Sequence, residues 1–179
     1  MAVERSTQQT HTDNPDQLLY DESYYANLRP YIKGDVMDIG AGALMFIKRY
    51  INNPEIKSVL AVDKFQENYQ QAKLKLNHWS CPQDLPKGKF DTVVSTEFIE
   101  HIERDQLEPL LNQIVDRLKD GGIFLGSTPN KISPTTNPYH LYEYTLEELK
   151  EILDKYFGEV KISDTGYNCT VWIATKLQS

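Results

Sequence analysis

The stretch "STEFIEHIE", residues 95 to 103, places Glu97, Glu100 and His101 directly after the apolar run "FDTVV". An imidazole titrates near pH ~6.5, so His101 is suited to accept a proton from a reacting hydroxyl, with Glu100 orienting it. His140, in "NPYHLYEYT", follows a later apolar run and could join them. Two carboxylates and two imidazoles can instead bind a divalent cation. The same residues could also have a purely structural role, with the acids and His101 at the start of a helix and His140 holding its loop in place.

A second candidate site is the turn "DIGAGAL", which begins at Asp38. Gly40 and Gly42 allow the backbone to pass close to a ligand at the start of a helix. The dinucleotide fingerprint needs a third glycine where this chain has Met45, and the Asp38 carboxylate would repel a pyrophosphate. Asp38 suits a ligand with an ammonium group. Asp63, which ends the next apolar run, can accept hydrogen bonds from both hydroxyls of a ribose.

A ligand with a ribose, a cationic amino-acid end and no phosphate is S-adenosylmethionine. The segments that bear on this ligand are, in order, "VMDIGAGA", "LAVDK", "FDTVVSTEFIEHI", "LKDGGIFLGSTPN" and "HLYEYTLEELKEIL". Together they resemble the class I S-adenosylmethionine-dependent methyltransferases over residues 34 to 176. The resemblance implies an α/β, Rossmann-like fold with a doubly wound, mostly parallel sheet of about seven strands, the last of them antiparallel.

The resemblance also implies which residues bind the cofactor. Those that match the family's glycine turn and ribose acid are Asp38, Gly40, Gly42 and Asp63. The other implied cofactor residues are Lys64 beside the ribose acid, Asp84 and Leu85 in "PQDLP" beside the adenine, and Glu97 toward the acceptor. The family often has a third glycine where this chain has Leu44, so we expect a tightened or reshaped turn.

The hydrophobic periodicity independently predicts strands that alternate with helices until the last two strands. The expected strands are 34–40, 57–64, 89–96, 123–127, 159–163 and 169–177. The expected helices are 43–51, 65–76, 104–119 and 146–157, the last with a capping box from Thr145 and Glu148. This order favours a parallel sheet to which an antiparallel strand is added late.

The chain is expected to form a single domain over residues 1–179. We predict a flexible end at 1–12, a helical lid over the cofactor at 13–33 and the core at 34–176. No apolar run approaches the ~20 residues of a membrane-spanning helix, and the first residues lack the apolar core of a signal peptide. These features predict a cytoplasmic protein, in which two distant cysteines do not form a disulfide framework.

The acceptor is harder to predict than the cofactor. The pattern E-x-x-E-H, "STPN" and a later histidine resembles the small-RNA 3′-terminal 2′-O-methyltransferases, in which Glu97, Glu100, His101 and His140 would hold a divalent metal. It also resembles ubiquinone-type and sugar methyltransferases. A net charge of −7 disfavours a nucleic-acid partner, whose phosphates need basic contacts.

We therefore predict O-methylation of a small-molecule or glycan acceptor, with S-adenosylhomocysteine as the second product. His101 is the expected proton acceptor, and Glu100 and His140 are the other expected catalytic residues, without a metal. A metal-dependent RNA 3′-terminal 2′-O-methyltransferase and a non-catalytic module that binds S-adenosylmethionine are the alternatives. The sequence leaves the identity of the acceptor and the oligomeric state open.

Overall fold

The computed structural model of the chain describes residues 15–63, 73–78, 85–132 and 137–178. The helices in these ranges are α1 (Pro15–Leu28), η2 (Arg29–Tyr31), α2 (Met45–Tyr50), η3 (Ile99–His101), α3 (Arg104–Arg117) and α4 (Leu146–Leu153). The strands are β1 (Gly34–Ile39), β2 (Ile56–Asp63), β3 (Leu74–His78), β4 (Phe90–Thr96), β5 (Leu118–Pro129), β6 (Glu159–Asp164) and β7 (Cys169–Thr175).

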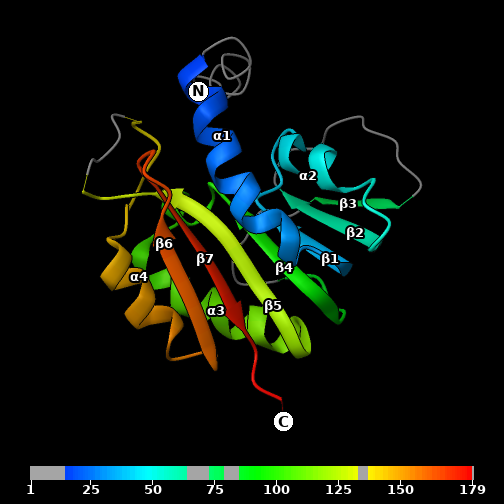
Figure 1. The fold of residues 1–179 in the computed structure, drawn as a ribbon. Helices are drawn as coiled ribbons and strands as arrows, with labels where there is room; N and C mark the ends of the chain where they lie inside the picture. Colours follow the sequence, from blue (N-terminus) through cyan, green and yellow to red (C-terminus); the bar gives the residue numbers. More distant parts are fainter. Residues whose placement is uncertain (1–14, 64–72, 79–84, 133–136, 179) are drawn as a thin grey trace.

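The seven strands form one mixed sheet with the order β3-β2-β1-β4-β5-β7-β6. The pairs β1–β2, β1–β4, β2–β3 and β4–β5 are parallel, whereas β7 runs antiparallel to both of its neighbours, β5 and β6. Figure 1 shows α1 and α2 on one side of this sheet and α3 and α4 on the other. The predicted fold class, a doubly wound α/β sheet with its last strand reversed, is confirmed.

Each face of the sheet has its own apolar core. On one face, Tyr24 and Leu28 of α1 and Phe46 of α2 pack against buried strand residues such as Val94. On the other face, α3 and α4 contribute the leucines and isoleucine of their apolar stripes, which are Leu107, Leu110, Leu111, Ile114, Leu149 and Leu153. The i, i+3, i+4 spacing of α3 thus faces the sheet as the sequence predicts.

The capping box predicted for α4 is present. The backbone N–H of Glu148 donates to Thr145 Oγ1 at 3.1 Å, and the N–H of Thr145 donates to Glu148 Oε2 at 3.0 Å. These two bonds satisfy donors that a helix start would otherwise leave unpaired. They also define where the long connection from β5 ends, and that connection carries His140.

The helix predicted over residues 65–76 is wrong at its end. Leu74 and Leu76 lie in β3, where they pair with Val59 and Ala61 of β2. The segment "LKLNH" alternates apolar and polar residues with a period of two, which is the pattern of a strand. Residues 64–72 lie outside the described part of the chain, so the rest of that predicted helix stays a prediction.

The boundary between α3 and β5 also differs from the prediction. The helix ends at Arg117, and β5 begins at Leu118 instead of at residue 123. Leu118 pairs with Phe90 and Ile123 pairs with Thr92, so the segment "KDGG" bulges within the strand. The two glycines therefore shape a strand irregularity and do not terminate the helix.

The N-terminal helix α1 bridges two parts of the fold. The hydroxyl of Ser23 donates to Thr165 Oγ1, in the turn between β6 and β7, at 3.1 Å. The hydroxyl of Tyr25 donates to the carbonyl of Arg49 in α2 at 2.8 Å. The expected lid role of residues 13–33 stays a prediction, and residues 1–14 lie outside the described part. None of the described helices has the length and apolar character needed to cross a membrane.

Candidate active site

The carboxyl ends of β1 and β4 meet at the centre of the sheet. The helix after β1 packs on one face and the helix after β4 packs on the other, so this is the switch point at which such sheets bind ligands. Phe98 follows β4, and a Cβ placed on Gly40 would collide with its ring. The glycine turn and the acid–histidine segment are therefore in contact and belong to one site.

Every second residue of the glycine turn, from Gly40 to Leu44, has a left-handed backbone conformation. Gly40, Gly42 and Leu44 have φ angles of 73°, 46° and 60°. The N–H of Gly40 donates to the carbonyl of Val62 at 2.9 Å, which ties the turn to β2. Leu44 adopts a conformation that costs an ordinary residue about 1–2 kcal/mol, and its side chain is buried in the α2 core. Leu44 thus packs its side chain inward while its backbone follows a left-handed path that glycine adopts more readily, and the expected reshaping of the turn stays a prediction.

Two acids lie at the ends of the adjacent strands β1 and β2. Asp38 is only 2% exposed and accepts a hydrogen bond from the hydroxyl of Tyr50 at 2.8 Å. Burial raises the pKa of Asp38 to about 7, the Tyr50 bond opposes that rise, and the nearby Asp63 carboxylate adds to it. Asp63 Oδ2 accepts the N–H of Gly42 at 2.7 Å. A cation beside Asp38 would favour its ionised form, so this carboxyl group is poised to respond to one.

The structure describes only one of the three residues predicted beside the ribose acid and the adenine, Leu85. Lys64 and Asp84 lie outside the described residues, and their cofactor roles stay predictions. Leu85 is buried in the core beneath α3, and its N–H donates to Gln113 Oε1 at 2.8 Å. Its carbonyl accepts a bond from Arg117 at 3.3 Å. The structure thus shows Leu85 held firmly by α3, while its contact with an adenine stays a prediction.

Glu97 turns the chain sharply at the end of β4. Its φ of 50° is left-handed, and its N–H donates to the carbonyl of Ser127 at 2.9 Å. The hydroxyl of the same serine donates to Glu97 Oε1 at 2.8 Å. Both bonds tie Glu97 to β5, and its bent backbone directs the next residues across the end of the sheet.

Glu100 is a buried carboxyl group within this site. Its Oε2 accepts a bond from the hydroxyl of Thr128 at 2.9 Å, while its Oε1 has no hydrogen-bond partner among the described residues. Burial raises the pKa of Glu100 well above its usual range, the Glu97 carboxylate adds to the rise, and the Thr128 bond opposes it. The neutral acid is therefore the favoured form of Glu100. Its backbone carbonyl accepts the N–H of Leu141 at 2.7 Å, which anchors the loop that carries His140.

His101 is partly exposed, with 37% of its side chain accessible. Its Nδ1 lies 3.0 Å from the carbonyl oxygen of Tyr139. A carbonyl only accepts hydrogen bonds, so Nδ1 carries the proton and the lone pair of the neutral ring is on Nε2. That nitrogen lies 3.9 Å from Glu100 Oε1. His101 therefore presents its lone pair at Nε2 near the buried acid, at a distance too long for a hydrogen bond.

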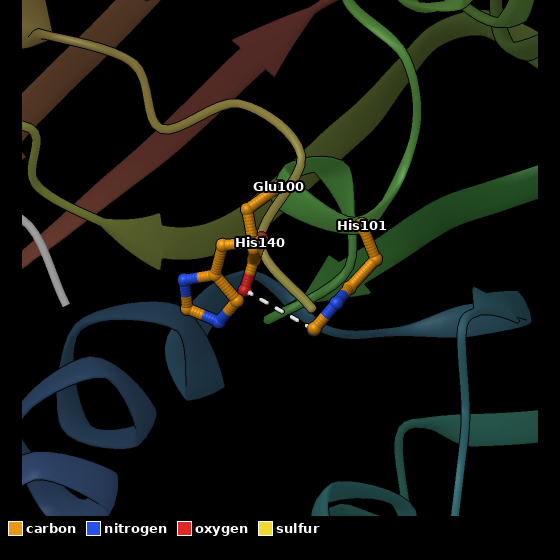
Figure 2. A group of neighbouring side chains, drawn as sticks. All are labelled: Glu100, His101 and His140. Atoms are coloured by element: carbon orange, nitrogen blue, oxygen red, sulfur yellow. Dashed lines mark ion pairs between the residues drawn. The ribbon is translucent and has the colours of Figure 1, made fainter. Parts of the chain in front are cut away.

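The second histidine completes a compact group. One possible metal-ligand atom from each of Glu100, His101 and His140 lies within 4.8 Å of the other two. The two imidazole rings pack edge to face, with their centroids 4.9 Å apart. Figure 2 shows the end of the Glu100 side chain between the two rings. Glu97, the fourth ligand of the metal-binding alternative, is not part of this group. The structure thus brings together three of the four predicted residues.

Three further residues support the site, and none of them is among the site residues predicted from the sequence. Tyr50 bonds Asp38, while Glu143 and Asn137 bond the two ring nitrogens of His140. Tyr50 is an apolar-face residue of α2, and no feature of the sequence distinguishes it from a core residue. Glu143 stands in the same segment as His140, so its spacing of three residues was a usable signal.

Comparison with known families agrees with this geometry. Residues 20–161 match the family described as "Methyltransferase domain". The chain belongs to this methyltransferase family. The match spans both halves of the site, from α1 through the glycine turn and the acid–histidine segment to β6.

Two curated proteins are similar to parts of the chain. The ubiquinone biosynthesis O-methyltransferase of Paramagnetospirillum magneticum is 26% identical over 68% of this chain and 54% of its own length. A probable S-adenosylmethionine-dependent methyltransferase of Mycolicibacterium smegmatis is 39% identical over 43% of this chain and 32% of its own length. The methyltransferase chain thus spans about half of the first relative and about a third of the second.

A solved structure is similar over nearly the whole chain. The structure of DhpI in complex with SAH superposes with a TM-score of 0.78 and 14% identity, covering 97% of this chain and 92% of DhpI. Identity at this level shows a shared fold only. The chain therefore shares its overall fold with that SAH-bound protein, and the comparison does not identify the acceptor.

Proposed function

We propose that this methyltransferase domain transfers a methyl group from S-adenosylmethionine to a hydroxyl oxygen of a small-molecule or glycan acceptor. The observation that carries the proposal is the contact of Phe98 with Gly40, because it unites the donor turn and the acid–histidine segment in one site. The names of the relatives support the donor, and the ubiquinone biosynthesis O-methyltransferase supports an oxygen acceptor.

The residues at the donor side fit S-adenosylmethionine. Asp38 would pair with its ammonium group, and the Asp63 carboxylate, fixed through the N–H of Gly42, would accept the ribose hydroxyls. Neither acid suits a phosphate. When bound, S-adenosylmethionine supplies a methyl group that its positively charged sulfur already activates. The protein therefore has to position the acceptor and remove its proton.

His101 would remove that proton. Its Nε2 carries the lone pair, because Nδ1 donates to the Tyr139 carbonyl. The proton of the acceptor hydroxyl would move to Nε2 as the oxygen attacks. Glu100, kept neutral by burial, would lie beside this imidazolium with its Oε1 3.9 Å from Nε2. As a neutral group, Glu100 would help to hold the orientation of the ring, and its own proton would stay in place during the transfer.

The metal-dependent alternative has one observation in its favour, the cluster of Glu100, His101 and His140 within 4.8 Å. Against it, Nε2 of His140 lies 2.9 Å from the amide nitrogen of Asn137, so a metal at this nitrogen would have to displace that side chain. The bond from Nδ1 to Glu143 does not separate the two mechanisms, because a metal-binding histidine commonly keeps a carboxylate on its other nitrogen. The reaction without a metal needs no such rearrangement and is the one that we propose.

Calorimetry with S-adenosylmethionine and S-adenosylhomocysteine tests the donor. We expect binding by the wild-type chain and a loss of affinity of roughly a hundredfold in Asp63→Ala, since a charged acceptor of two hydrogen bonds is removed. The absence of binding would contradict the proposed function.

Formation of S-adenosylhomocysteine with a panel of acceptors then tests the reaction. The panel contains phenols, sugars and an RNA oligonucleotide with a free 2′-hydroxyl at its 3′ end, each with and without excess chelator. We expect turnover with a phenol or a sugar that survives chelation. Chelator-sensitive turnover with the RNA would favour the metal-dependent alternative, and binding without turnover throughout would favour a non-catalytic module.

A further inference from the structure

The connection between β5 and α4 folds around the ring of His140. The side chain of Asn137 accepts the N–H of Tyr139 at its Oδ1, at 3.0 Å. Its other atom, Nδ2, lies 2.9 Å from His140 Nε2. Because the oxygen of the amide faces an N–H group, its nitrogen must face the imidazole. An amide nitrogen only donates, so Nε2 of His140 accepts this hydrogen bond.

Glu143 holds the opposite side of the same ring. Its Oε1 lies 2.5 Å from His140 Nδ1, and the two side chains are only 8% and 10% exposed. A carboxylate accepts hydrogen bonds, so Nδ1 carries the proton of the ring. Both neighbours thus select the same tautomer of His140. Protonation of Nε2 would set an N–H group against the N–H of Asn137, which disfavours His140 as a proton acceptor in this arrangement.

The braced ring fixes the position of the carbonyl that orients His101. Tyr139 lies between Asn137 and His140 in the chain, and its carbonyl is the group that accepts the bond from His101 Nδ1 at 3.0 Å. The two imidazole rings also meet at an interplanar angle of 83°. A shift of this loop would therefore move both contacts that hold His101.

We propose that Asn137 and Glu143 are positioning residues that select the tautomer of His101 by clamping the loop around His140. Given the proposed function, in which His101 accepts the acceptor's proton, this clamp keeps the lone pair on Nε2, toward Glu100. Neither residue has to touch the acceptor or the methyl donor to do so. Their role is to hold the Tyr139 carbonyl against Nδ1 of His101.

The test is a long-range ¹H–¹⁵N correlation spectrum of the full chain with ¹⁵N-labelled histidines. Its signals distinguish the two neutral tautomers and the imidazolium of each ring, and the variants His101→Gln and His140→Gln assign them. In the wild-type chain we expect the Nδ1–H tautomer for both rings. In Asn137→Ala and Glu143→Ala we expect at least half of His101 to change to the Nε2–H tautomer.

Two conservative variants separate this role from a general loss of structure. Glu143→Gln keeps an oxygen that accepts from Nδ1, so we expect it to retain the wild-type tautomers. Asn137→Asp keeps the acceptor for the N–H of Tyr139 but places a carboxylate against Nε2 of His140. With carboxylates on both sides, His140 should become an imidazolium at pH 7, while His101 keeps its tautomer. The exposed Asn112→Ala is the control and should change no histidine signal.

A wild-type tautomer of His101 in both alanine variants would overturn the proposal. If those variants do not fold, Asn137→Asp decides, because a neutral His140 in that variant would show that Asn137 does not face Nε2 and would equally overturn it. The failure of the proposed function is a separate result, since it would appear as wild-type turnover in His101→Gln. The tautomer signals do not depend on that turnover.

Discussion

The two sides of the site are built by different means. On the donor side, Gly40 and Gly42 are held by backbone bonds between adjacent parallel strands and by the Asp63 carboxylate. On the acceptor side, His101 depends on the carbonyl of Tyr139, which is 38 residues away in a loop. The donor side is thus fixed by the sheet, whereas the acceptor side is fixed by contacts between connections. A fold that keeps its donor can therefore change its acceptor through loop residues alone.

The two sides also use buried carboxyl groups differently. Burial raises the pKa of Asp38 to about 7, so a cationic ligand can ionise it near neutral pH. Burial also raises the pKa of Glu100 well above its usual range, with the Glu97 carboxylate adding to the effect. Asp38 is thus suited to recognise a positive charge that arrives with the donor. Glu100 is suited to stay neutral beside His101.

The largest expected effect is at the contact that joins the two sides. In Gly40→Ala the new Cβ would strike the Phe98 ring, and the residue would have to keep a φ of 73°. We expect a loss of about 4 kcal/mol or more in the free energy of unfolding, measured by urea denaturation, and no detectable binding of S-adenosylmethionine.

Gly166→Ala is the matched control, because Gly166 has a φ of 81° but its Cβ would meet no atom within 4 Å. It should cost only about 1 kcal/mol, which is the backbone strain alone. Equal losses in the two variants would show that the Phe98 contact does not matter and that the two sides are not coupled through it.

A smaller effect, confined to the acceptor side, is expected for His101→Gln. Without a proton acceptor, turnover with the acceptor that the panel identifies should fall by about a hundredfold to ten-thousandfold. The affinity for S-adenosylmethionine, measured by calorimetry, should stay within about twofold of wild type. A parallel loss of affinity for S-adenosylmethionine would mean that His101 also supports the donor side and that the two sides are not separable.

The sequence carries more information about the position of the glycine turn and Asp63 than about the contacts of His101, because the sheet places the former and a loop places the latter. Gly40, Gly42 and Asp63 follow apolar strands, and neighbouring parallel strands bring such residues together wherever the loops go. The contact of His101 with Tyr139 depends on a loop path that no periodicity encodes. Its bracing by Asn137 likewise became apparent only from the hydrogen bonds. The strand at Leu74 was missed because a short alternating run beside a polar segment also fits a helix end.

The next effect concerns the electrostatics of the donor side. Asp38→Asn keeps an oxygen for the Tyr50 hydroxyl but cannot carry a charge. We expect its affinity for S-adenosylmethionine to fall by roughly tenfold to a hundredfold at pH 8, since a charge-assisted contact is lost. Wild-type affinity should weaken as the pH falls below about 7, because Asp38 must then lose a proton to pair with the ligand. Calorimetry from pH 5.5 to 8.5 should show this slope in the wild type and none in the variant.

The same substitution has a signed effect on stability. The pKa of Asp38 is about 7 in the folded chain and 3.8 in its reference state, so the folded chain retains a proton that the unfolded chain releases. Asp38 therefore contributes stability that is fully present below pH ~4 and is lost as the pH rises through about 7, by on the order of 4 kcal/mol. Asp38→Asn should be the more stable protein at pH 8. Asp35→Asn, at the opposite end of β1, is the control and should leave donor affinity unchanged.

The smallest effect is expected at Leu44, where backbone strain and side-chain packing oppose each other. Leu44 is 2% exposed at a φ of 60°. Leu44→Gly loses the packing but relieves the strain, so we expect a net loss of about 1–2 kcal/mol in the free energy of unfolding. Leu44→Ala loses nearly the same packing and keeps the strain. It should therefore be less stable than the glycine variant by about 1 kcal/mol, although alanine is the larger residue.

Urea denaturation of the two variants side by side measures this difference, and a more stable alanine variant would show that the turn stores no strain. The relative stability of the two variants thus shows whether position 44 of the donor turn is strained by its left-handed backbone conformation.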